Sequence, residues 1–326
     1  MRIGLLGAAR ITPKAIVEPA SVIPTCSLQG IAARDSDRAR AFAEKYGVKE
    51  AHQDYDAIVK DESIDLIYNA LPINLHASWA IKALEAGKHV LCEKPFAMNI
   101  DEAQAMLAAA EKSGRRIIEA FHYRYHPGFI ALLNWISSGE IGAVRSIEAH
   151  FNAPMKNTGR EIRHMPETGG GAMMDLGCYP LNWVMQITGA APVSVDAAAT
   201  VTPAGVDESM EATLVFENGV RARIDATMAL DSAFSANLKV VGEAGEITLD
   251  NPLQPHMSAV LSLNASGKTV TRTPSNISTY TYQLGAVLGA LRAGEKTPTE
   301  GDIILRQQQA IDNIYAAAGL THLRRR

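Results

Sequence analysis

Short apolar runs alternate with stretches of helical periodicity through the first 120 residues of this 326-residue chain, and this alternation constrains the fold more than any other feature. Strands that alternate with helices of this length form parallel sheets with right-handed crossovers. The sequence therefore predicts an α/β domain over residues 1–120, built on a doubly wound parallel sheet. Its strands are expected at 1–6, 27–32, 64–70, 88–92 and 116–121.

Residues 121–326 follow a different pattern, in which polar and apolar side chains alternate along successive short segments. A period of two is typical of strands with one buried face, and Asn218-Gly219 is typical of a tight hairpin turn. We expect an α+β domain with a large, mainly antiparallel open sheet. Because such a sheet leaves one face uncovered, a homo-oligomer, either a dimer or a tetramer formed through this sheet, is also expected. The strands are expected at 143–151, 193–201, 210–216, 220–228, 236–241, 246–249 and 260–263, and the main helices at 172–187, 279–293 and 302–318.

Composition and charge exclude several classes of protein. The net charge of −4 and the pI near 6.2 do not suit a nucleic-acid-binding protein, and no apolar run is long enough for a membrane span. The three cysteines show neither a disulfide framework nor metal-ligand spacing, so reduced thiols, a cytoplasmic location and no metal site are expected. No leader peptide is expected before the first strand, and the arginines at 324–326 are expected to form a solvated tail.

The turn after the first predicted strand carries an altered dinucleotide-binding fingerprint. The pattern Gly-x-Gly-x-x-Gly stands here as Gly7-x-Ala9-x-x-Thr12. Gly7 would allow the tight turn, and Ala9 is small enough for the backbone to approach a pyrophosphate at the start of the next helix. An ordinary strand–turn–helix would explain this stretch alone equally well, but the strand at 27–32 follows at the right distance for a Rossmann domain.

The end of the second strand bears on the choice of cofactor. An acidic residue at this position hydrogen-bonds the ribose 2′-hydroxyl of NAD, whereas an arginine accommodates the 2′-phosphate of NADP. Arg34 comes first here and Arg38 lies one helical turn further on, while Asp35 between them is a good N-cap for the next helix. We therefore favour NADP, with NAD left open. The alternative is that both arginines are surface charges at the start of a helix.

The strand at 88–92 runs directly into Glu93-Lys94-Pro95. Open α/β sheets bind their ligands beyond the carboxyl ends of the strands, and Pro95 restricts the backbone of the lysine before it. Glu93 and Lys94 are therefore candidate site residues, although solvated charges at an ordinary strand end would look the same.

A glycine run opens the other informative segment, from Gly169 to Pro180. Asp175 and Tyr179 lie four residues apart, so on a helix they share one face. Polar side chains in so apolar a helix need partners, which makes both candidates for chemistry. Tyr179 could instead place its ring in the core and its hydroxyl on a carbonyl oxygen, and Pro180 could either kink the helix or mark a restart.

In this order, the glycine turn, the Glu93-Lys94-Pro95 strand end and the segment from Gly169 to Pro180 resemble the glucose-fructose oxidoreductase / inositol dehydrogenase family, Gfo/Idh/MocA. The resemblance extends over essentially the whole chain. The form Asp-x-Gly-x-Tyr at 175–179 and the stretch at 119–127 look like the branch that contains dimeric dihydrodiol dehydrogenase and NADP-dependent D-xylose dehydrogenase.

The resemblance implies an NAD(P)-dependent oxidoreductase that transfers a hydride between the nicotinamide cofactor and a secondary alcohol or hemiacetal carbon of a sugar or cyclic diol. Lys94 would bond the nicotinamide ribose and the reacting oxygen, Tyr179 would exchange a proton with that oxygen, and Asp175 would orient Lys94 or the substrate. The cofactor contacts implied by the motif and the resemblance come from Gly7, Ala9, Arg10, Ile11, Arg34, Arg38, Leu71, Pro72, Asn74, His76, Glu93, Lys94, Pro95, Arg124 and Arg163.

Several positions depart from the family pattern. Thr12 replaces the last glycine of the fingerprint, Ile73 stands where relatives commonly have Asn, Ile162 replaces an aromatic residue, and His122 stands where Met is usual. Two other functions remain open on the same fold. One is a glycosidase that uses bound NAD for transient oxidation and elimination, and the other is a dinucleotide-binding sensor without turnover.

Overall fold

The computed structural model describes residues 1–323, so the tail expected at 324–326 lies outside the described residues. The chain divides into two compact units. The first combines Met1–His122 with Tyr280–Leu305, and the second contains Tyr123–Thr279 and residues 306–323. The sequence-based boundary, with domains at 1–120 and 121–326, assigned all of 280–305 to the second domain. Because the units differ from these domains by that segment, the two domain ranges stay a prediction.

The first unit is built on a six-stranded sheet in which every strand runs parallel to its neighbours. The spatial order is β3-β2-β1-β4-β5-β6, so the order reverses between β1 and β4. β1, β4, β5 and β6 are almost entirely buried, which explains their apolar sequences and confirms the doubly wound sheet. The strands are β1 (Arg2–Leu6), β2 (Ser27–Ala32), β3 (Glu50–Ala51), β4 (Leu66–Asn69), β5 (His89–Cys92) and β6 (Ile117–Glu119).

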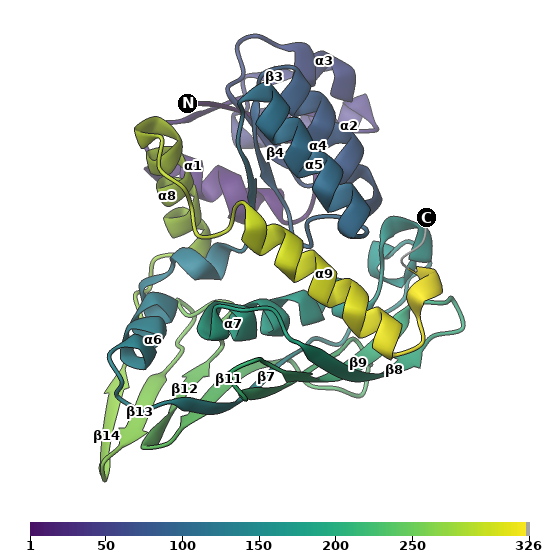
Figure 1. Ribbon diagram of the computed structural model, residues 1–326. Coiled ribbons are helices and arrows are strands. Elements are labelled where there is room, and N and C mark those ends of the chain that lie inside the picture. Colours follow the sequence, from purple (N-terminus) through teal and green to yellow (C-terminus); the bar gives the residue numbers. More distant parts are fainter. Residues whose placement is uncertain (324–326) are drawn as a thin grey trace. The chain divides into compact units, whose positions relative to one another are not determined.

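Helices pack against this sheet, and Figure 1 shows α4 and α5 side by side over it. Alanines on α4 and α5 allow this close approach, because Ala80, Ala83 and Ala103 lie in one buried cluster with Met106. The helix starts are capped by the side chains of Asp35, Asp54 and Asn99, each of which accepts backbone N–H bonds. The helices are α1 (Glu18–Val22), preceded by a wider π-helical turn at Pro13–Val17, α2 (Ser36–Tyr46), α3 (Tyr55–Lys60), α4 (His76–Glu85), α5 (Ile100–Ser113) and α8 (Thr279–Ala293).

The second unit contains an eight-stranded sheet of order β14-β13-β12-β11-β7-β10-β9-β8. All neighbouring strands are antiparallel except β7 and β10, which confirms the mainly antiparallel sheet predicted from the period of two. The strands are β7 (Val144–Asn152), β8 (Ser194–Val201), β9 (Asp207–Val215), β10 (Arg221–Thr227), β11 (Ser235–Gly242), β12 (Gly245–Asp250), β13 (Leu261–Ala265) and β14 (Lys268–Arg272).

One face of this sheet is apolar and is covered by the helix that carries the second group of candidate residues. Ile147, Ala149 and Phe151 of β7 are buried on this face, whereas His150 points to the opposite face and bonds Asn237 at 3.1 Å. A π-helical turn at Met173–Gly177 continues directly into α7 (Cys178–Thr188), and both pack against β7 and β10 (Figure 1). The other helices of the unit are α6 (Pro127–Ser137) and most of α9 (Asp302–Ala317).

Short 3₁₀ turns join several of these elements. They are η2 (Ile73–Leu75), η3 (His122–Tyr125), η4 (Ile162–His164), η5 (Pro166–Thr168) and η7 (Thr321–Leu323). Among residues 1–323, no helix is both long and apolar enough to cross a membrane. All three cysteines are free thiols.

Candidate functional site

The turn after β1 has the backbone geometry that a dinucleotide requires. Gly7 adopts a φ of +93°, and its N–H donates to the carbonyl oxygen of Ala32 at 2.9 Å. A Cβ on Gly7 would lie 3.2 Å from Leu71 in a conformation that side chains rarely adopt, so the position needs glycine. Thr12 is fully buried at the start of the following helix, and its hydroxyl has no partner among the described residues.

The tip of β2 is cationic. The carboxylate of Asp35 accepts the backbone N–H groups of Asp37 at 2.9 Å and Arg38 at 3.3 Å, so it is used as the N-cap of α2. Arg34 is exposed, and Arg38 donates through Nη2 to the carbonyl oxygen of Ala8 at 3.1 Å. Arg38 is thereby held against the turn that follows β1. A 2′-phosphate at this strand end would meet positive charge, as the sequence predicts for NADP.

The loop that follows β5 is held by contacts on both sides of Lys94. Glu93 is 8 % exposed, and its Oε1 accepts the hydroxyl of Tyr68 at 2.6 Å. The N–H of Lys94 donates to the other oxygen of Glu93 at 3.3 Å, and the Lys94–Pro95 peptide is cis. Lys94 itself is partly exposed at the carboxyl edge of the sheet. Glu93 therefore fixes the main chain at Lys94 through this hydrogen bond.

His76 contacts the same loop through its imidazole ring. Its Nδ1 lies 3.1 Å from the carbonyl oxygen of Pro95 and 3.2 Å from that of Phe96, and its Nε2 lies 2.8 Å from that of Leu71. Burial lowers the pKa of His76 to about 4 despite these carbonyl contacts, so the ring is neutral at physiological pH. The sequence predicted His76 as a cofactor contact, and these three carbonyl contacts support a positioning role between two loops.

Glu119 is a buried acid that sequence reasoning missed. It ends β6 opposite Cys92 of β5 and is only 3 % exposed. Burial raises the pKa of Glu119 to about 8, the charge of nearby Glu93 acts in the same direction, and the Phe96 N–H and Lys94 work against it. A glutamate at the end of an apolar run was the available signal, but its burial depends on neighbours that are distant in sequence.

In the second unit, the π-helical turn and α7 carry Asp175 and Tyr179. Pro180 lacks an N–H, so the backbone widens into the π-helical turn ahead of it and then continues as an α-helix without a restart. The carbonyl oxygen of Asp175 receives the thiol of Cys178 at 3.8 Å. The continuous helical backbone excludes a restart at Pro180, one of the two alternatives that the sequence left open.

Arg163 pairs with Asp175, a contact that the sequence did not predict. Its Nε donates to Asp175 Oδ2 at 2.5 Å, and its Nη1 donates to Glu161 Oε1 at 2.9 Å. The charge of Asp175 raises the pKa of Arg163 further above its usual range. The arginine and the aspartate, predicted separately as a cofactor contact and a catalytic residue, therefore lie together on one side of the glycine run.

A buried aspartate anchors the start of this helix. Asp207 is fully buried and accepts the Met173 N–H at 2.6 Å and the Tyr315 hydroxyl at 2.7 Å. Gly171 leaves room for this carboxylate, since an added Cβ would lie 2.0 Å from its Oδ1. A carboxylate near the first N–H groups of a helix is also favoured by the helix dipole. Sequence reasoning missed Asp207 because it stands at the edge of a predicted strand with no motif around it.

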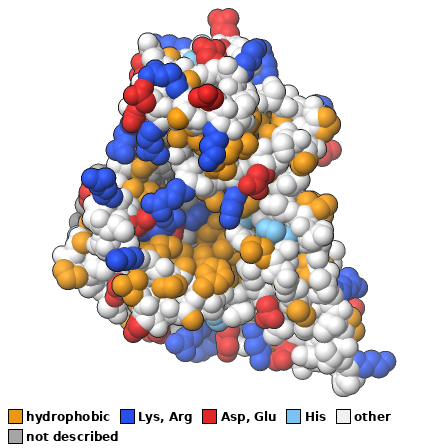
Figure 2. All heavy atoms as spheres, turned by 180° about the vertical axis from the view of Figure 1, so that it is seen from behind, with side chains coloured by type: hydrophobic (Ala, Val, Ile, Leu, Met, Phe, Trp, Pro, Cys, Tyr) orange, Lys and Arg blue, Asp and Glu red, His pale blue; other side chains and the backbone are white. Residues whose placement is uncertain are grey.

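Aromatic rings surround Tyr179, which is 4 % exposed. Its ring lies 5.8 Å from Phe151, 6.2 Å from Tyr123 and 6.4 Å from Trp183. Phe151 in turn contacts Phe234, an exposed residue, at 6.0 Å. Figure 2 shows exposed hydrophobic side chains interspersed with Lys and Arg on one face of the molecule.

Hydrogen bonds between side chains support the same helix. The Tyr123 hydroxyl donates to Asn182 Oδ1 at 2.5 Å, Asn182 Nδ2 donates to Gln307 at 3.1 Å, and Gln307 donates to the carbonyl oxygen of Cys178 at 2.9 Å. Arg124, predicted as a cofactor contact, donates through Nε to Gln186 at 2.8 Å in this unit. The residues before and after Tyr179 are therefore fixed to α9 and to Tyr123 and Arg124 of η3.

The remaining candidate residues differ in how exposed they are. Arg10 and Asn74 are exposed, and Ile11 is partly exposed. His122, which the sequence considered as a surface residue or a pocket residue, is 1 % exposed and stacks on Tyr280 with ring centres 4.0 Å apart. Within the first unit, the structure brings Gly7, Arg38 and the Leu71 and Lys94 loops to the carboxyl edge of the sheet. Within the second, it brings together Arg163, Asp175 and the helix of Tyr179.

A strand order that reverses beside a glycine turn defines the first unit as an NAD(P)-binding Rossmann domain. Residues 1–121 match the oxidoreductase family with an NAD-binding Rossmann fold, GFO/IDH/MocA, and residues 129–248 match the C-terminal domain of that family. The chain belongs to the GFO/IDH/MocA family of oxidoreductases, and the resemblance found in the sequence is confirmed.

Several relatives illustrate this membership. D-xylose 1-dehydrogenase (NADP(+)) 2 of Haloferax volcanii is 33% identical, covering 98% of this chain and 97% of the relative. Trans-1,2-dihydrobenzene-1,2-diol dehydrogenase of Xenopus tropicalis is 34% identical, covering 69% of this chain and 68% of the relative. The crystal structure of KijD10, a 3-ketoreductase from Actinomadura kijaniata in complex with NADP and TDP-benzene, matches with a TM-score of 0.89 and 27% identity, covering 97% of each chain.

Proposed function

We propose that this protein is an NADP-dependent oxidoreductase that acts at a secondary alcohol or hemiacetal carbon of a sugar or cyclic diol. Membership of an oxidoreductase family supports the reaction type. The substrate class is supported by relatives named as a D-xylose dehydrogenase, a dihydrodiol dehydrogenase and a 3-ketoreductase. The observation that carries the choice of NADP is the tip of β2, where Asp35 is engaged as a helix cap and Arg34 and Arg38 supply the charge.

The residues of the first unit fit a dinucleotide. Gly7 leaves its turn open to a close backbone approach, and Arg38 is held at that turn by Ala8. Together with the start of the next helix, this arrangement favours a pyrophosphate and a 2′-phosphate. When bound, the nicotinamide would supply or accept the hydride.

Lys94 and Tyr179 are proposed to move the proton. A phenol is a weak base near neutral pH unless a cation favours its ionised form, and the ammonium of a lysine supplies such a charge. Glu93 and His76 would keep the Lys94 loop in place, while the Arg163–Asp175 pair would hold the carboxylate in a fixed orientation. Proton transfer of this kind contributes on the order of 10²–10⁴-fold to a rate.

Turnover is tested by following the absorbance of the reduced cofactor. The purified protein is mixed with NADP⁺ or NAD⁺ and with D-xylose, D-glucose, myo-inositol or a trans-dihydrodiol. We expect turnover with at least one of these substrates, lost by at least about 100-fold in Lys94→Ala and Tyr179→Phe. Lys60→Ala and Tyr46→Phe, which make the same changes elsewhere in the first unit, serve as controls. Equal activity in Tyr179→Phe and Tyr46→Phe would remove Tyr179 from the mechanism.

Cofactor choice has its own test. Arg34→Asp places an acidic side chain at the tip of β2, where it would repel a 2′-phosphate and could bond a 2′-hydroxyl. We expect the ratio of kcat/KM for NADP⁺ to that for NAD⁺ to fall by at least about tenfold, a change of about 1.4 kcal/mol. Arg40→Asp makes the same charge change on α2 away from the strand tip. An unchanged ratio in Arg34→Asp would refute the assignment of this residue.

Two further properties belong to this proposal. We propose that the protein is cytoplasmic, in keeping with its three free thiols, and that it forms a dimer or tetramer through the open face of the second sheet. Light scattering during gel filtration tests the assembly, and a monomer at micromolar concentration would contradict it. Fractionation of the cells that make the protein tests the location.

A further inference from the structure

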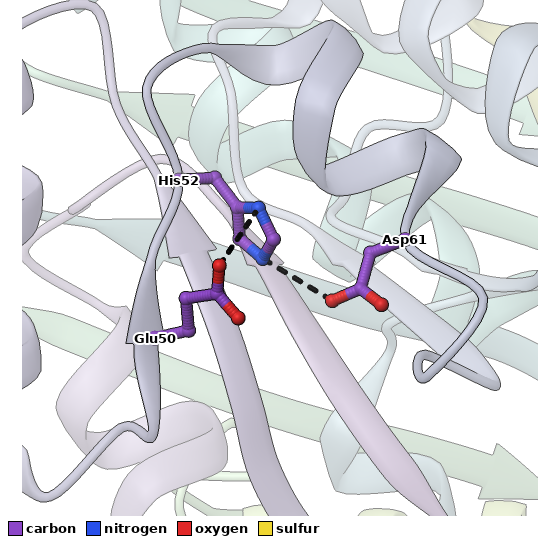
Figure 3. Close-up of side chains that lie close together, drawn as sticks. All are labelled: Glu50, His52 and Asp61. Carbon is purple, nitrogen blue, oxygen red and sulfur yellow. Dashed lines mark ion pairs between the residues drawn. The ribbon is translucent and has the colours of Figure 1, made fainter.

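Glu50, His52 and Asp61 form a compact group in the first unit, outside the residues assigned to the cofactor. Glu50 lies in β3, His52 follows that strand directly, and Asp61 caps the end of α3. Figure 3 shows the imidazole between the two carboxylates, with Nε2 3.3 Å from Asp61 Oδ2 and Nδ1 3.9 Å from Glu50 Oε1. One donor atom from each residue lies within 4.8 Å of the others.

The His52 ring is buried and one of its nitrogens lacks a hydrogen-bond partner. Its side chain is 8 % exposed, and Nε2 has no hydrogen-bond partner among residues 1–323. The ring lies against Gly30 of β2, where an added Cβ would be 2.7 Å from Nε2. Packing therefore holds the ring with Nε2 turned toward Asp61. A buried polar atom without a partner is costly, so such an atom in a native structure points to a missing group.

The separation from Asp61 suits a bridging ion better than a hydrogen bond. Charge-assisted N–H···O bonds measure about 2.7–2.9 Å, shorter than the 3.3 Å found here, and the contact also lacks hydrogen-bond geometry. Zinc binds nitrogen and carboxylate oxygen at about 2.0–2.2 Å in tetrahedral sites, which places neighbouring ligand atoms about 3.4 Å apart. Nε2 and Asp61 Oδ2 are therefore spaced as two corners of such a site. The side chain of Glu50 is 58 % exposed, so it can rotate to supply a third ligand.

We propose that Glu50, His52 and Asp61 bind a divalent transition-metal ion of the Zn²⁺ class, with water as the fourth ligand. One imidazole nitrogen and two carboxylates balance the charge of such an ion, whereas Mg²⁺ and Ca²⁺ prefer ligand sets made only of oxygen. Lys88 lies nearby, but its ammonium donates to the main-chain oxygen of Asp61 at 2.7 Å. The side-chain carboxylate of Asp61 can therefore bind the ion. The other oxygen of that carboxylate accepts the Ser63 N–H at 2.7 Å and fixes its orientation.

The ion would serve as a clamp in the first unit. β3 pairs with β2 at two positions only, Glu50 opposite Gly30 and Ala51 opposite Ile31. An ion bound to Glu50, His52 and Asp61 would join this short edge strand to the end of α3. The sequence did not predict the site, because Asp61 lies beyond a whole helix from His52 and no metal motif has this spacing.

Zinc binding is measured on the full-length, tag-free protein after chelation and dialysis. Isothermal titration with Zn²⁺ gives the stoichiometry, thermal unfolding gives the shift of Tm, and Co²⁺ in place of Zn²⁺ reports tetrahedral geometry by its visible absorption. The variants are His52→Ala and Asp61→Asn, the second of which keeps an acceptor for the Ser63 N–H. Glu62→Gln removes a charge from the neighbouring position without touching the three ligands and is the matched control.

We expect one equivalent of Zn²⁺ per chain and a Tm raised by several degrees. The affinity should fall by at least about 10-fold in Asp61→Asn and His52→Ala and stay unchanged in Glu62→Gln. Mg²⁺ at the same concentration should leave Tm unchanged. Absence of stoichiometric binding to the parent protein, or an affinity that Asp61→Asn does not alter, would overturn the proposal. The outcome is independent of catalytic activity, since none of the three residues is assigned to cofactor or substrate.

Discussion

Replacing Glu119 by Gln should make the protein more stable at neutral and alkaline pH. Glu119 ends β6, is 3 % exposed and accepts the backbone N–H of Phe96. Burial raises the pKa of this carboxyl to about 8 from 4.5. A glutamine has nearly the same shape, and its amide oxygen can still accept the Phe96 N–H, so the variant differs mainly in being unable to ionise.

The magnitude follows from the two pKa values of Glu119. Because the folded-state pKa is raised, the contribution of the neutral acid to stability is complete below pH 4.5 and is lost as the pH rises through about 8. Each unit of difference corresponds to about 1.4 kcal/mol, so the loss reaches roughly 3 kcal/mol at pH 7 and approaches roughly 5 kcal/mol above pH 8. Glu119→Gln removes this loss. At about 2–4 °C per kcal/mol, its Tm should exceed that of the parent by at least about 5 °C at pH 8.

The assay is thermal unfolding of both proteins from pH 5 to pH 9 in buffers of equal ionic strength. The difference in Tm between Glu119→Gln and the parent should be small at pH 5 and should widen steadily toward pH 9. Glu85→Gln changes an exposed glutamate on α4 and should show no such trend. A difference for Glu119→Gln that stays constant across this pH range would show that the carboxyl is ionised in the folded protein and would refute the reasoning.

Three other perturbations test the supports of the site. Asp207→Ala removes the buried carboxylate that accepts from the Met173 N–H and the Tyr315 hydroxyl, and it should cost roughly 3 kcal/mol or more, seen as a lower midpoint in urea unfolding. Gly171→Ala would place a Cβ 2.0 Å from that carboxylate at a φ of +131°, so it should lower Tm far more than Gly189→Ala, whose Cβ would meet nothing within 4 Å. The pKa of His76, lowered to about 4 by burial, makes the neutral ring stabilising above pH 6.5, and up to roughly 3 kcal/mol should be lost as the pH falls toward 4. His76→Gln should flatten this acid limb, and an unchanged limb would exclude the ring as its source.

Local sequence patterns were sufficient for most of the secondary structure. β2 and α8 begin and end at the expected residues, because apolar periodicity and capping residues act within a few positions of each element. β14 was missed because all five of its residues are exposed, so its sequence lacks the alternation of polar and apolar side chains that predicts a strand. The two-residue strand β3 is too short to carry a pattern.

Contacts between distant residues were beyond the reach of these patterns. The Arg163–Asp175 pair joins residues that the sequence had placed in separate roles, and Asp207 supports a helix that begins more than thirty positions before it in the chain. Neither contact can be inferred from periodicity or from a motif, because each joins residues that lie far apart in the sequence. The helix at 279–293 was found, but periodicity does not tell which compact unit a helix joins.

The return of the chain to its first unit sets the order in which that unit can be completed during synthesis. Arg116 donates to Glu300 Oε2 at 2.7 Å and to the carbonyl oxygen of Ala290 at 2.9 Å, and the Glu119 N–H donates to Thr299. A ribosome makes all of Tyr123–Thr279 before it reaches these partners. In the nascent chain, the last strand of the Rossmann sheet therefore lacks its contacts with residues 290–300. These contacts form only when synthesis is nearly complete.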